Sequence, residues 1–424
     1  MKRLLFIAHR VPYPPDKGER TRAFHEIKAL ADHFRVTVAA LCHTPADEQS
    51  AAALGPWCEK IITARGVGFA GRLRSAASVL CGRSATEGFF HSKRLERLLA
   101  EEARREPFDL VLAYCSSMFP VAMTVPAKAR VTDLVDADSA KWADYAQTAS
   151  RVNRWLYRRE SRAVAALETR AIRDCEAVVV VSAAEAKALP CQSPKVIPVG
   201  NGVDTEFFQP AGPDATQAEA SLVFTGSMDY RPNVEGVCWF VREVWPRLRR
   251  QVPSATFTVV GRDPAPAVRQ LAKTPGVAVT GSVPDVRPYL AAASVVVCPL
   301  HIARGIQNKI LEAMAAGRAV VASAAAIEGL DVEVGRDLLR ADTPEEWAGQ
   351  IGRLVGSLDE RRRLEQSARR CVAENYSWPA RMAPLVALCR RLVGEEGPDH
   401  APVGAGPFRQ SHRANAEAGE SCGR

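Results

Sequence analysis

Short apolar runs recur along the first half of the chain, and amphipathic segments separate them. The runs at residues 4–8, 36–41 and 110–114 show no polar alternation, which is typical of strands buried on both faces of a parallel sheet. In the segments between them, apolar residues recur at the spacing of helices that cover such a sheet. The pattern therefore predicts an α/β chain in which strands and helices alternate.

The second half repeats this pattern. Apolar runs at residues 221–227, 256–261, 277–283 and 293–300 predict further buried strands, and residues 320–342 continue the alternation. Each run is short and ends at a turn signal, which favours a strand over a buried helix. We therefore expect a second sheet, built in the same way as the first.

A turn and a polar linker divide the two halves. Asn201 and Gly202 mark a tight turn, and a polar stretch follows before the next apolar run. A chain of 424 residues with 47% hydrophobic residues can bury two cores. The last residues hold few large apolar side chains, which is typical of disorder. We predict domains at residues 1–203 and 204–375, a final helix at 376–393 and a disordered tail at 394–424.

Residues 301–317 have the most specific pattern in the chain, with the sequence His-Ile-Ala-Arg-Gly-Ile-Gln-Asn-Lys-Ile-Leu-Glu-Ala-Met-Ala-Ala-Gly. They follow a predicted strand, turn at Gly305 and predict a helix that ends at Gly317. The free N–H groups of a first helical turn favour an anion, and Gly305 would let a phosphate approach the backbone. We therefore predict a phosphate site that includes Arg304, Gly305, Ile306 and Gln307.

Lys309 and Glu312 lie on one face of that helix, because they are three residues apart. A cation for phosphate beside a carboxylate that accepts from a ribose hydroxyl is what a nucleoside diphosphate requires. The alternative is a solvated Lys–Glu pair on an amphipathic helix. A proline-rich loop after the first strand adds Lys17, Arg20 and the nearby Arg22, which could steady phosphate charge at the edge of the sheet where ligands bind. The alternative is that they are ordinary basic surface residues beside a turn.

Residues 309–322, Lys-Ile-Leu-Glu-Ala-Met-Ala-Ala-Gly-Arg-Ala-Val-Val-Ala, resemble the most recognisable segment of glycosyltransferase family 4. The resemblance covers roughly residues 1–392 and is strongest at 221–330. It implies the GT-B fold: two Rossmann-like, doubly wound domains facing a cleft, with the last helix crossing back to the first domain. It also implies retaining transfer of a sugar from a nucleoside diphosphate sugar, here a UDP-sugar, without a metal ion.

The resemblance implies roles for single residues, and one position departs from it. The implied donor site comprises Gly18, Gly226, Ser227, Arg231, Asn233, Val283, Arg304, Gly305, Ile306, Gln307, Lys309 and Glu312, and the implied catalytic residues are Asp138, Arg231, Lys309 and Glu312. Arg231 and Asn233 match positions under the pyrophosphate, and Val283 lies where the family reads the base. Arg304 stands where the family often carries a second glutamate.

Asp136 and Asp138 form a D-x-D pair after the predicted strand at residues 130–135. In GT-A glycosyltransferases such a pair holds a divalent metal ion that bridges the donor phosphates. Here the pair lies in the first predicted domain and the phosphate helix in the second. We therefore expect Asp138 to contact the acceptor or to act as a base, and we predict no metal site.

Two other functions fit the same fold. A nucleotide-sugar 2-epimerase would turn over the donor without an acceptor, and a non-catalytic GT-B subunit would bind a partner enzyme. Arg304 is the reason to consider the second. Within family 4, the chain also resembles sugar transferases associated with exosortase and PEP-CTERM export systems. That resemblance implies a glycan or lipid-linked acceptor in exopolysaccharide or envelope glycan synthesis.

The net charge of +8 is concentrated in a few places. Residues 151–173 hold seven arginines and two glutamates around Trp155. A basic helix with interfacial aromatics suits an anionic membrane face, and the alternative is a solvated basic helix. We expect no nucleic-acid binding, since no recognition motif accompanies the charge.

Apolar run lengths and the cysteines suggest where the protein works. No run approaches the roughly 18 apolar residues of a membrane span. The 11 cysteines show no metal spacing and are typical of free thiols in a reducing compartment. We therefore expect a cytoplasmic protein that contacts the inner face of the cytoplasmic membrane at its periphery.

Overall fold

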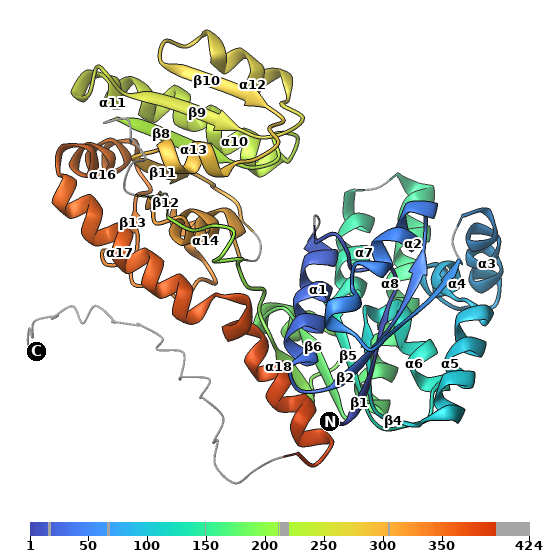
Figure 1. Ribbon diagram of the computed structural model, residues 1–424. Coiled ribbons are helices and arrows are strands. Elements are labelled where there is room, and N and C mark those ends of the chain that lie inside the picture. Colours follow the sequence, from blue (N-terminus) through green and yellow to red (C-terminus); the bar gives the residue numbers. More distant parts are fainter. Residues whose placement is uncertain are drawn as a thin grey trace, which may run out of the picture.

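A computed structural model of the chain describes residues 1–15, 18–65, 68–148, 150–210, 212, 220–303 and 306–395. It has two lobes, each built on one parallel sheet (Figure 1). The predicted alternation of strands and helices is confirmed in both halves of the chain. The predicted tail, apart from its first two residues, lies outside the described residues.

Within the described ranges, the first lobe contains seven strands with helices between them. Its elements are β1 (Arg3–Ala8), α1 (Gly18–Ala31), β2 (Arg35–Cys42), α2 (Pro45–Ala52), β3 (Lys60–Arg65), α3 (Phe69–Leu80), α4 (Ala85–Phe90), α5 (Lys93–Arg105), β4 (Phe108–Tyr114), α6 (Phe119–Thr124), β5 (Ala127–Val135), α7 (Asp138–Thr148), α8 (Arg151–Asp174), β6 (Ala177–Val180), α9 (Ala183–Ala188) and β7 (Val196–Pro198).

The second lobe contains six strands, and two long helices follow it. Its elements are β8 (Ser221–Thr225), α10 (Arg231–Trp239), α11 (Trp245–Gln251), β9 (Thr256–Val260), α12 (Pro266–Gln270), β10 (Val277–Gly281), α13 (Arg287–Ala292), β11 (Val295–Cys298), α14 (Asn308–Ala315), β12 (Ala319–Ala322), α15 (Ala324–Ile327), β13 (Leu339–Arg340), α16 (Pro344–Gly356), α17 (Leu358–Asn375) and α18 (Trp378–Leu392).

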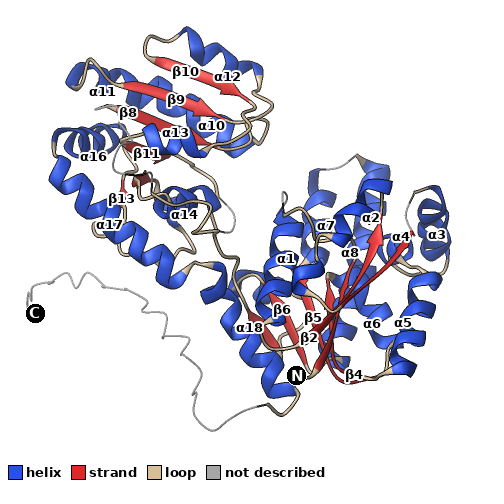
Figure 2. Cartoon of the chain, in the orientation of Figure 1, coloured by secondary structure: helices blue, strands red, loops and turns tan. Residues whose placement is uncertain are grey.

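Both sheets are doubly wound. The first has the order β3-β2-β1-β4-β5-β6-β7 and the second β10-β9-β8-β11-β12-β13, with every strand parallel to its neighbour. Helices lie on both sides of each sheet (Figure 2). In β1, Leu4 and Phe6 face one core while Leu5 and Ile7 face another, because side chains alternate along a strand. Strands buried on both faces explain the absence of polar alternation in the sequence.

The last two helices connect the lobes. α17 and α18 follow one another from the second lobe to the first (Figure 1), and Trp378, Met382 and Leu385 of α18 join the core of the first sheet. The Trp378 ring stacks on His25 of α1, with 4.3 Å between ring centroids. The expected crossing of the last helix is therefore confirmed. The exact domain limits at 203 and 375 remain predictions.

The point at which the strand order reverses indicates the edge of each sheet where a ligand site is expected. In each sheet the first strand along the chain lies inside the sheet, and connections lead from it to both sides. In such sheets ligands bind outside the carboxyl ends of the strands near this switch point. The loops that follow β1, β4 and β5 in the first lobe, and β8, β9 and β11 in the second, are therefore where functional side chains are to be sought.

Candidate functional site

Lys309 extends from the first turn of α14 towards the end of β8. Its Nζ donates to Oδ1 of Asn233 at 2.5 Å and lies 4.4 Å from the centroid of the Phe224 ring. Burial lowers the pKa of Lys309, and the nearby Cys298 and Glu312 act in the opposite direction. Among the described residues Asn233 is its one hydrogen-bond acceptor, and an ammonium has three donors. Two donors are therefore left for a ligand.

Two glycines allow this close packing. A Cβ added at Gly226 would lie 3.0 Å from Nζ of Lys309 and 2.8 Å from Nδ2 of Asn233. One added at Gly261, after β9, would lie only 1.6 Å from the carbonyl oxygen of Gly226. Nδ2 of Asn233 donates to the carbonyl of Ser227 at 2.8 Å, which fixes the side chain. The structure thus brings together four residues predicted for the donor site: Gly226, Ser227, Asn233 and Lys309.

Glu312 lies one turn further along α14. Its carboxylate accepts no hydrogen bond within the described part of the chain, and burial raises its pKa while Lys309 opposes the shift. Gln307 occupies the position before the helix, and Ile306 packs against the core. The carboxylate is free to accept from a hydroxyl group.

The remaining predicted donor residues are placed as follows. Arg304 and Gly305 lie outside the described residues. Val283, after β10, is half-buried against the core. Arg231 begins α10 with 85% of its side chain exposed, and its Nε donates to Glu235 at 2.7 Å. The structure therefore shows no contact of the Arg231 side chain with Lys309 or Asn233 among the described residues, and the contact of Arg231 with phosphate remains a prediction.

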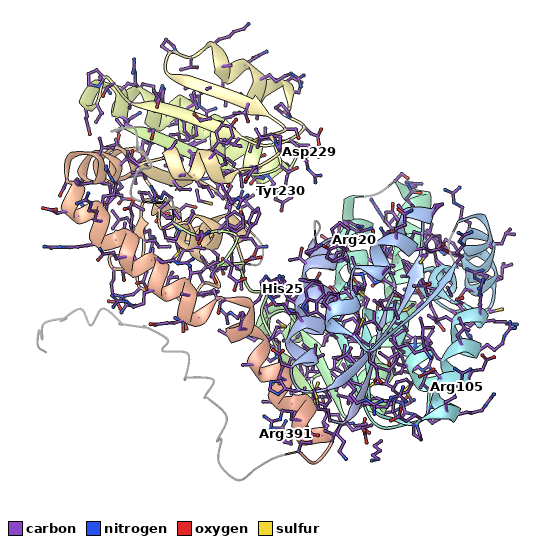
Figure 3. The ribbon with its side chains drawn as sticks, in the orientation of Figure 1. Arg20, His25, Arg105, Asp229, Tyr230 and Arg391 are labelled. Atoms are coloured by element: carbon purple, nitrogen blue, oxygen red, sulfur yellow. The ribbon has the colours of Figure 1, made fainter. Side chains whose placement is uncertain are left out.

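A second cation at this edge was not predicted. Arg262 follows β9, and its Nε donates to Oγ of Ser227 at 3.2 Å, while that hydroxyl donates to Asp229 at 2.7 Å. Asp229 and Tyr230 lie on the side of the second lobe that faces the first (Figure 3). Nothing in the local sequence marks Arg262, since the glycine turn it reaches lies 35 residues earlier.

Asp138 is the first residue of α7, at the carboxyl end of β5. Its Oδ2 accepts from Oγ of Ser116 at 3.0 Å, and Oδ1 lies 3.7 Å from Nζ of Lys141. Burial raises the pKa of Asp138, and Lys141 opposes the shift. Lys141 also pairs with Asp136, so its ammonium contacts both members of the D-x-D pair. Across the described ranges, no three His, Cys, Asp or Glu side chains are grouped to hold a metal ion.

The two strands that present these groups end in unusual backbone. Cys115 after β4 has φ 73° and Val135 at the end of β5 has φ 67°. Positive φ is costly for a residue with a Cβ, and most of all for a β-branched one. The carboxylate of Asp133 accepts from the amide of Val135 at 2.7 Å, and its carbonyl accepts from the amide of Cys115 at 2.7 Å. The two turns aim Ser116 and Asp138 at each other.

The basic residues after β1 do not act as the sequence suggested. Arg22 is 1% exposed and pairs with Asp133 at 2.7 Å and with Glu26 at 2.9 Å. The expectation that Arg22 steadies phosphate is wrong, because its guanidinium is paired with two buried carboxylates inside the lobe. Arg20 lies 3.7 Å from Asp47, and Lys17 is outside the described residues. Gly18 begins α1, which places it at the predicted edge of the sheet.

The basic stretch predicted to meet a membrane forms most of α8. Trp155 is 67% exposed there, and a shallow pocket around it is lined by Arg151, Arg154, Trp155, Arg158, Arg159 and Arg162. Tyr145 of the neighbouring α7 is also exposed. In the described part of the chain no helix combines the length and the apolar character that a membrane span needs.

The chain is similar in sequence to a known family and to a curated protein. Residues 219–357 match the family described as glycosyl transferases group 1. A curated relative is the MMP alpha-(1->4)-mannosyltransferase of Mycolicibacterium hassiacum, 27% identical over 327 residues that cover 71% of this chain and 74% of the relative. The matched family segment contains Lys309 and Asn233, the turns at Gly226 and Gly261, and Arg262.

Solved structures show the same architecture along almost the whole chain. Sucrose-phosphate synthase from Thermosynechococcus elongatus superimposes with a TM-score of 0.64 at 18% identity, covering 93% of this chain and 100% of that one. Anabaena HepE in complex with UDP and glucose gives 0.58 at 16% identity, covering 93% and 99%. These likenesses confirm the GT-B fold expected from the sequence.

Proposed function

We propose that this chain, whose second lobe matches the group 1 glycosyl transferases and whose fold is GT-B, binds a UDP-sugar around Lys309 in its second lobe and presents an acceptor hydroxyl at Asp138 in its first. One observation carries this proposal. Lys309 is held in place by Asn233 while two of its donors and the Glu312 carboxylate remain without partners in the described residues. A partly buried cation beside a carboxylate that accepts no hydrogen bond from the described residues suits a diphosphate joined to a hydroxyl-bearing sugar.

The donor side would lower the barrier by holding the leaving group. As the glycosidic bond breaks, the departing diphosphate gains negative charge, and a fixed cation stabilises that charge more in the transition state than in the ground state. Lys309 supplies the cation, and the free N–H groups at the start of α14 supply partial positive charge. Arg262, beside Ser227, is a second candidate for the same role.

The acceptor side would supply orientation and a proton acceptor. Asp138 shares its carboxylate with Ser116 and Lys141, so its two oxygens are fixed in direction. Its raised pKa strengthens it as a base relative to an ordinary aspartate. We propose that transfer retains the configuration at the anomeric carbon, as family 4 implies, and needs no metal ion because cations and helix-end N–H groups balance the diphosphate.

For the acceptor we propose a glycan or lipid-linked sugar reached at an anionic membrane surface. The support is α8, whose arginines surround the exposed Trp155. The association with exosortase and PEP-CTERM systems, and hence with exopolysaccharide or envelope glycan synthesis, remains a proposal from sequence resemblance. The similarity to a mannosyltransferase supports the proposal that the transferred sugar is a hexose.

A donor screen followed by a transfer assay tests the proposal. Thermal unfolding would be measured with a panel of UDP- and GDP-sugars, since a ligand at 100 times its dissociation constant adds roughly 2.7 kcal/mol to stability. The selected donor, labelled in its sugar, would then be incubated with bacterial membrane extract. We expect stabilisation by a UDP-sugar and label in a lipid or glycan product.

Other outcomes separate the alternatives. Conversion of the donor to its 2-epimer without acceptor would identify an epimerase. Donor binding without transfer to any extract would favour a non-catalytic subunit. Stabilisation by GDP-sugars alone would show that the nucleotide base of the donor is guanine and not uracil, and the proposed diphosphate site would stand.

A further inference from the structure

The carboxylate of Glu168, on α8, is fully buried against the loop that carries Asp138. Its Oε1 accepts from the amide of Ser139 at 3.0 Å, and Oε2 accepts from the hydroxyl of the same residue at 2.5 Å. Oγ of Ser161, also on α8, donates to the carbonyl of Ser139 at 2.8 Å. Three bonds from one helix thus fix the residue that directly follows Asp138.

We propose that Glu168 is a positioning residue: it caps the start of α7 from a neighbouring helix and so sets the place and direction of the Asp138 carboxylate. The inference rests on the proposed role of Asp138 in the acceptor site. A side-chain cap on the first free N–H groups of a helix is an ordinary stabilising device. Here the cap comes from 29 residues away along the chain, and the capped turn is the one that carries the functional side chain.

The same helix carries the basic surface. On α8, Trp155, Arg158 and Arg162 line the outer face, while Glu168 lies on the face buried against the lobe. The side chain that fixes Asp138 and the side chains proposed to meet an anionic surface therefore belong to one rigid element. A shift of α8 would move both together.

The charge of Glu168 changes near neutral pH. Burial raises its pKa to about 7, the bonds from Ser139 oppose the shift, and the Asp138 carboxylate adds to it. The ionisable groups around the loop are Asp136, Asp138 and Lys141, with His9 at the end of β1 and Glu185 on α9. Only an ionised Glu168 accepts from both groups of Ser139. Transfer should therefore increase as pH rises through about 7.

Glu160 is a matched control on the same helix. It is 3% exposed and caps α4 in the same manner, accepting from Oγ of Ser84 at 2.6 Å and from the amides of Ala85 and Thr86 at 2.8 and 3.0 Å. Its removal disturbs an equally buried cap that does not touch Asp138. A general weakening of α8 should affect both variants alike.

The experiment compares Glu168→Ala, Glu168→Gln, Glu160→Ala and Asp138→Asn. Hydrogen exchange needs no substrate: Glu168→Ala should expose amides at residues 136–141, and Glu160→Ala those at 84–88. Glu168→Gln should retain only part of the protection at 136–141, because its amide nitrogen cannot accept from the Ser139 hydroxyl. With the UDP-sugar selected by the screen, Glu168→Ala should lose between ten- and a hundredfold in kcat, while the affinity for UDP stays within about twofold of wild type. The inflection near pH 7 should be present in wild type and absent in Glu168→Gln.

Several results would overturn the inference. Unchanged exchange at 136–141 in Glu168→Ala would show that the cap does not hold the loop. Full transfer by Glu168→Ala beside an inactive Asp138→Asn would remove the positioning role and leave the proposed function intact. Full transfer by Asp138→Asn would instead remove Asp138 from the reaction. Equal losses of transfer in Glu160→Ala and Glu168→Ala would reduce both to structural caps.

Discussion

The candidate donor site at Lys309 and the candidate acceptor site at Asp138 are held in place by different interactions. Around Lys309 in the second lobe, glycines let the loops pack closely, and the polar contacts go to an amide side chain and a backbone carbonyl. Around Asp138 in the first lobe, buried charged side chains hold the loops in place: Asp133 pairs with Arg22, and Glu168 caps the loop at Ser139. One site is shaped mainly by packing, and the other mainly by electrostatics.

This difference follows from what each site has to do. A donor site must leave hydrogen-bonding capacity for the ligand, and the Lys309 ammonium and Glu312 carboxylate have it. An acceptor site must aim one carboxylate, and Asp138 is aimed by bonds to Ser116 and by the fixed turn at Ser139. Charges that fix geometry also titrate, so we expect the first lobe to be the more sensitive to pH.

The largest effect is expected from breaking the buried ion pair of the first lobe. Asp133→Ala would leave the buried guanidinium of Arg22 with Glu26 as its one carboxylate partner among the described residues, and removal of one partner of a buried pair costs about 3–5 kcal/mol. It would also remove the acceptor that holds the amide of Val135. Urea denaturation should report this as a lower free energy of unfolding for the first lobe.

Asp337 provides the matched comparison in the second lobe. It is 1% exposed, but its partner Arg336 keeps 59% of its side chain in solvent. Asp337→Ala should cost only about 1–3 kcal/mol, the value for unsatisfied donors, since no charge is left buried. A loss as large as that of Asp133→Ala would contradict the contrast between the lobes.

The pH dependence of the Asp337 contribution has a definite sign. Burial acts to raise the pKa of Asp337, but Arg336 and the other donors outweigh it and hold that pKa at about 2, below the ordinary value of 3.8. The contribution is therefore complete above 3.8 and is lost as pH falls towards 2. Asp337→Asn should flatten the stability curve in that window and should lower stability at neutral pH, where the wild-type contribution is complete.

An intermediate effect is expected at Glu312. Removing its carboxylate would delete a charge-assisted hydrogen bond to the sugar nucleotide, worth about 1.5–3 kcal/mol, or roughly one to two powers of ten in kcat/KM. Glu312→Ala and Glu312→Gln should both fold normally, because no described residue donates to this carboxylate. Turnover close to wild type in both variants would remove Glu312 from the site.

The smallest effect per residue concerns the membrane surface. Each basic residue near an anionic surface contributes about 1 kcal/mol, and salt screens the attraction. Substituting glutamate at Arg154, Arg158 and Arg162 should weaken co-sedimentation with anionic vesicles at low salt and leave UDP affinity unchanged.

The control for this surface is on α17 of the second lobe. Three exposed arginines there, Arg362, Arg363 and Arg370, allow the same change of charge at another place, and their reversal should have little effect on vesicle binding. If wild type ignores anionic vesicles at low salt, α8 is a solvated basic helix.

The sequence was sufficient for the fold and for the existence of helix α14. Buried parallel strands and sheet-covering helices leave patterns over a few residues, and so does the end of α14 at Gly317, with φ 66°. These features are local, and the structure confirms them. The packing of Ile310, Leu311 and Met314 was equally readable, since helical spacing decides which face is apolar.

What the sequence could not supply depends on distant partners. Arg22 looks like a phosphate ligand until Asp133, 111 residues away, is found beside it. Asn233 and Lys309 are separated by 76 residues, and Glu168 and Ser139 by 29. The positive φ of Val135 has no sequence signal, because β-branched residues ordinarily avoid it.

The most direct test of the central claim is the titration of UDP into the protein in the presence of EDTA, for wild type and for Lys309→Ala. Lys273, an exposed lysine of the same lobe, provides the control substitution. The account predicts that UDP binds wild type and Lys273→Ala equally well without metal, and that Lys309→Ala loses roughly ten- to a hundredfold in affinity. Binding that requires added Mg²⁺ or Mn²⁺ and is lost in Asp136→Asn, or that survives Lys309→Ala unchanged, would contradict it.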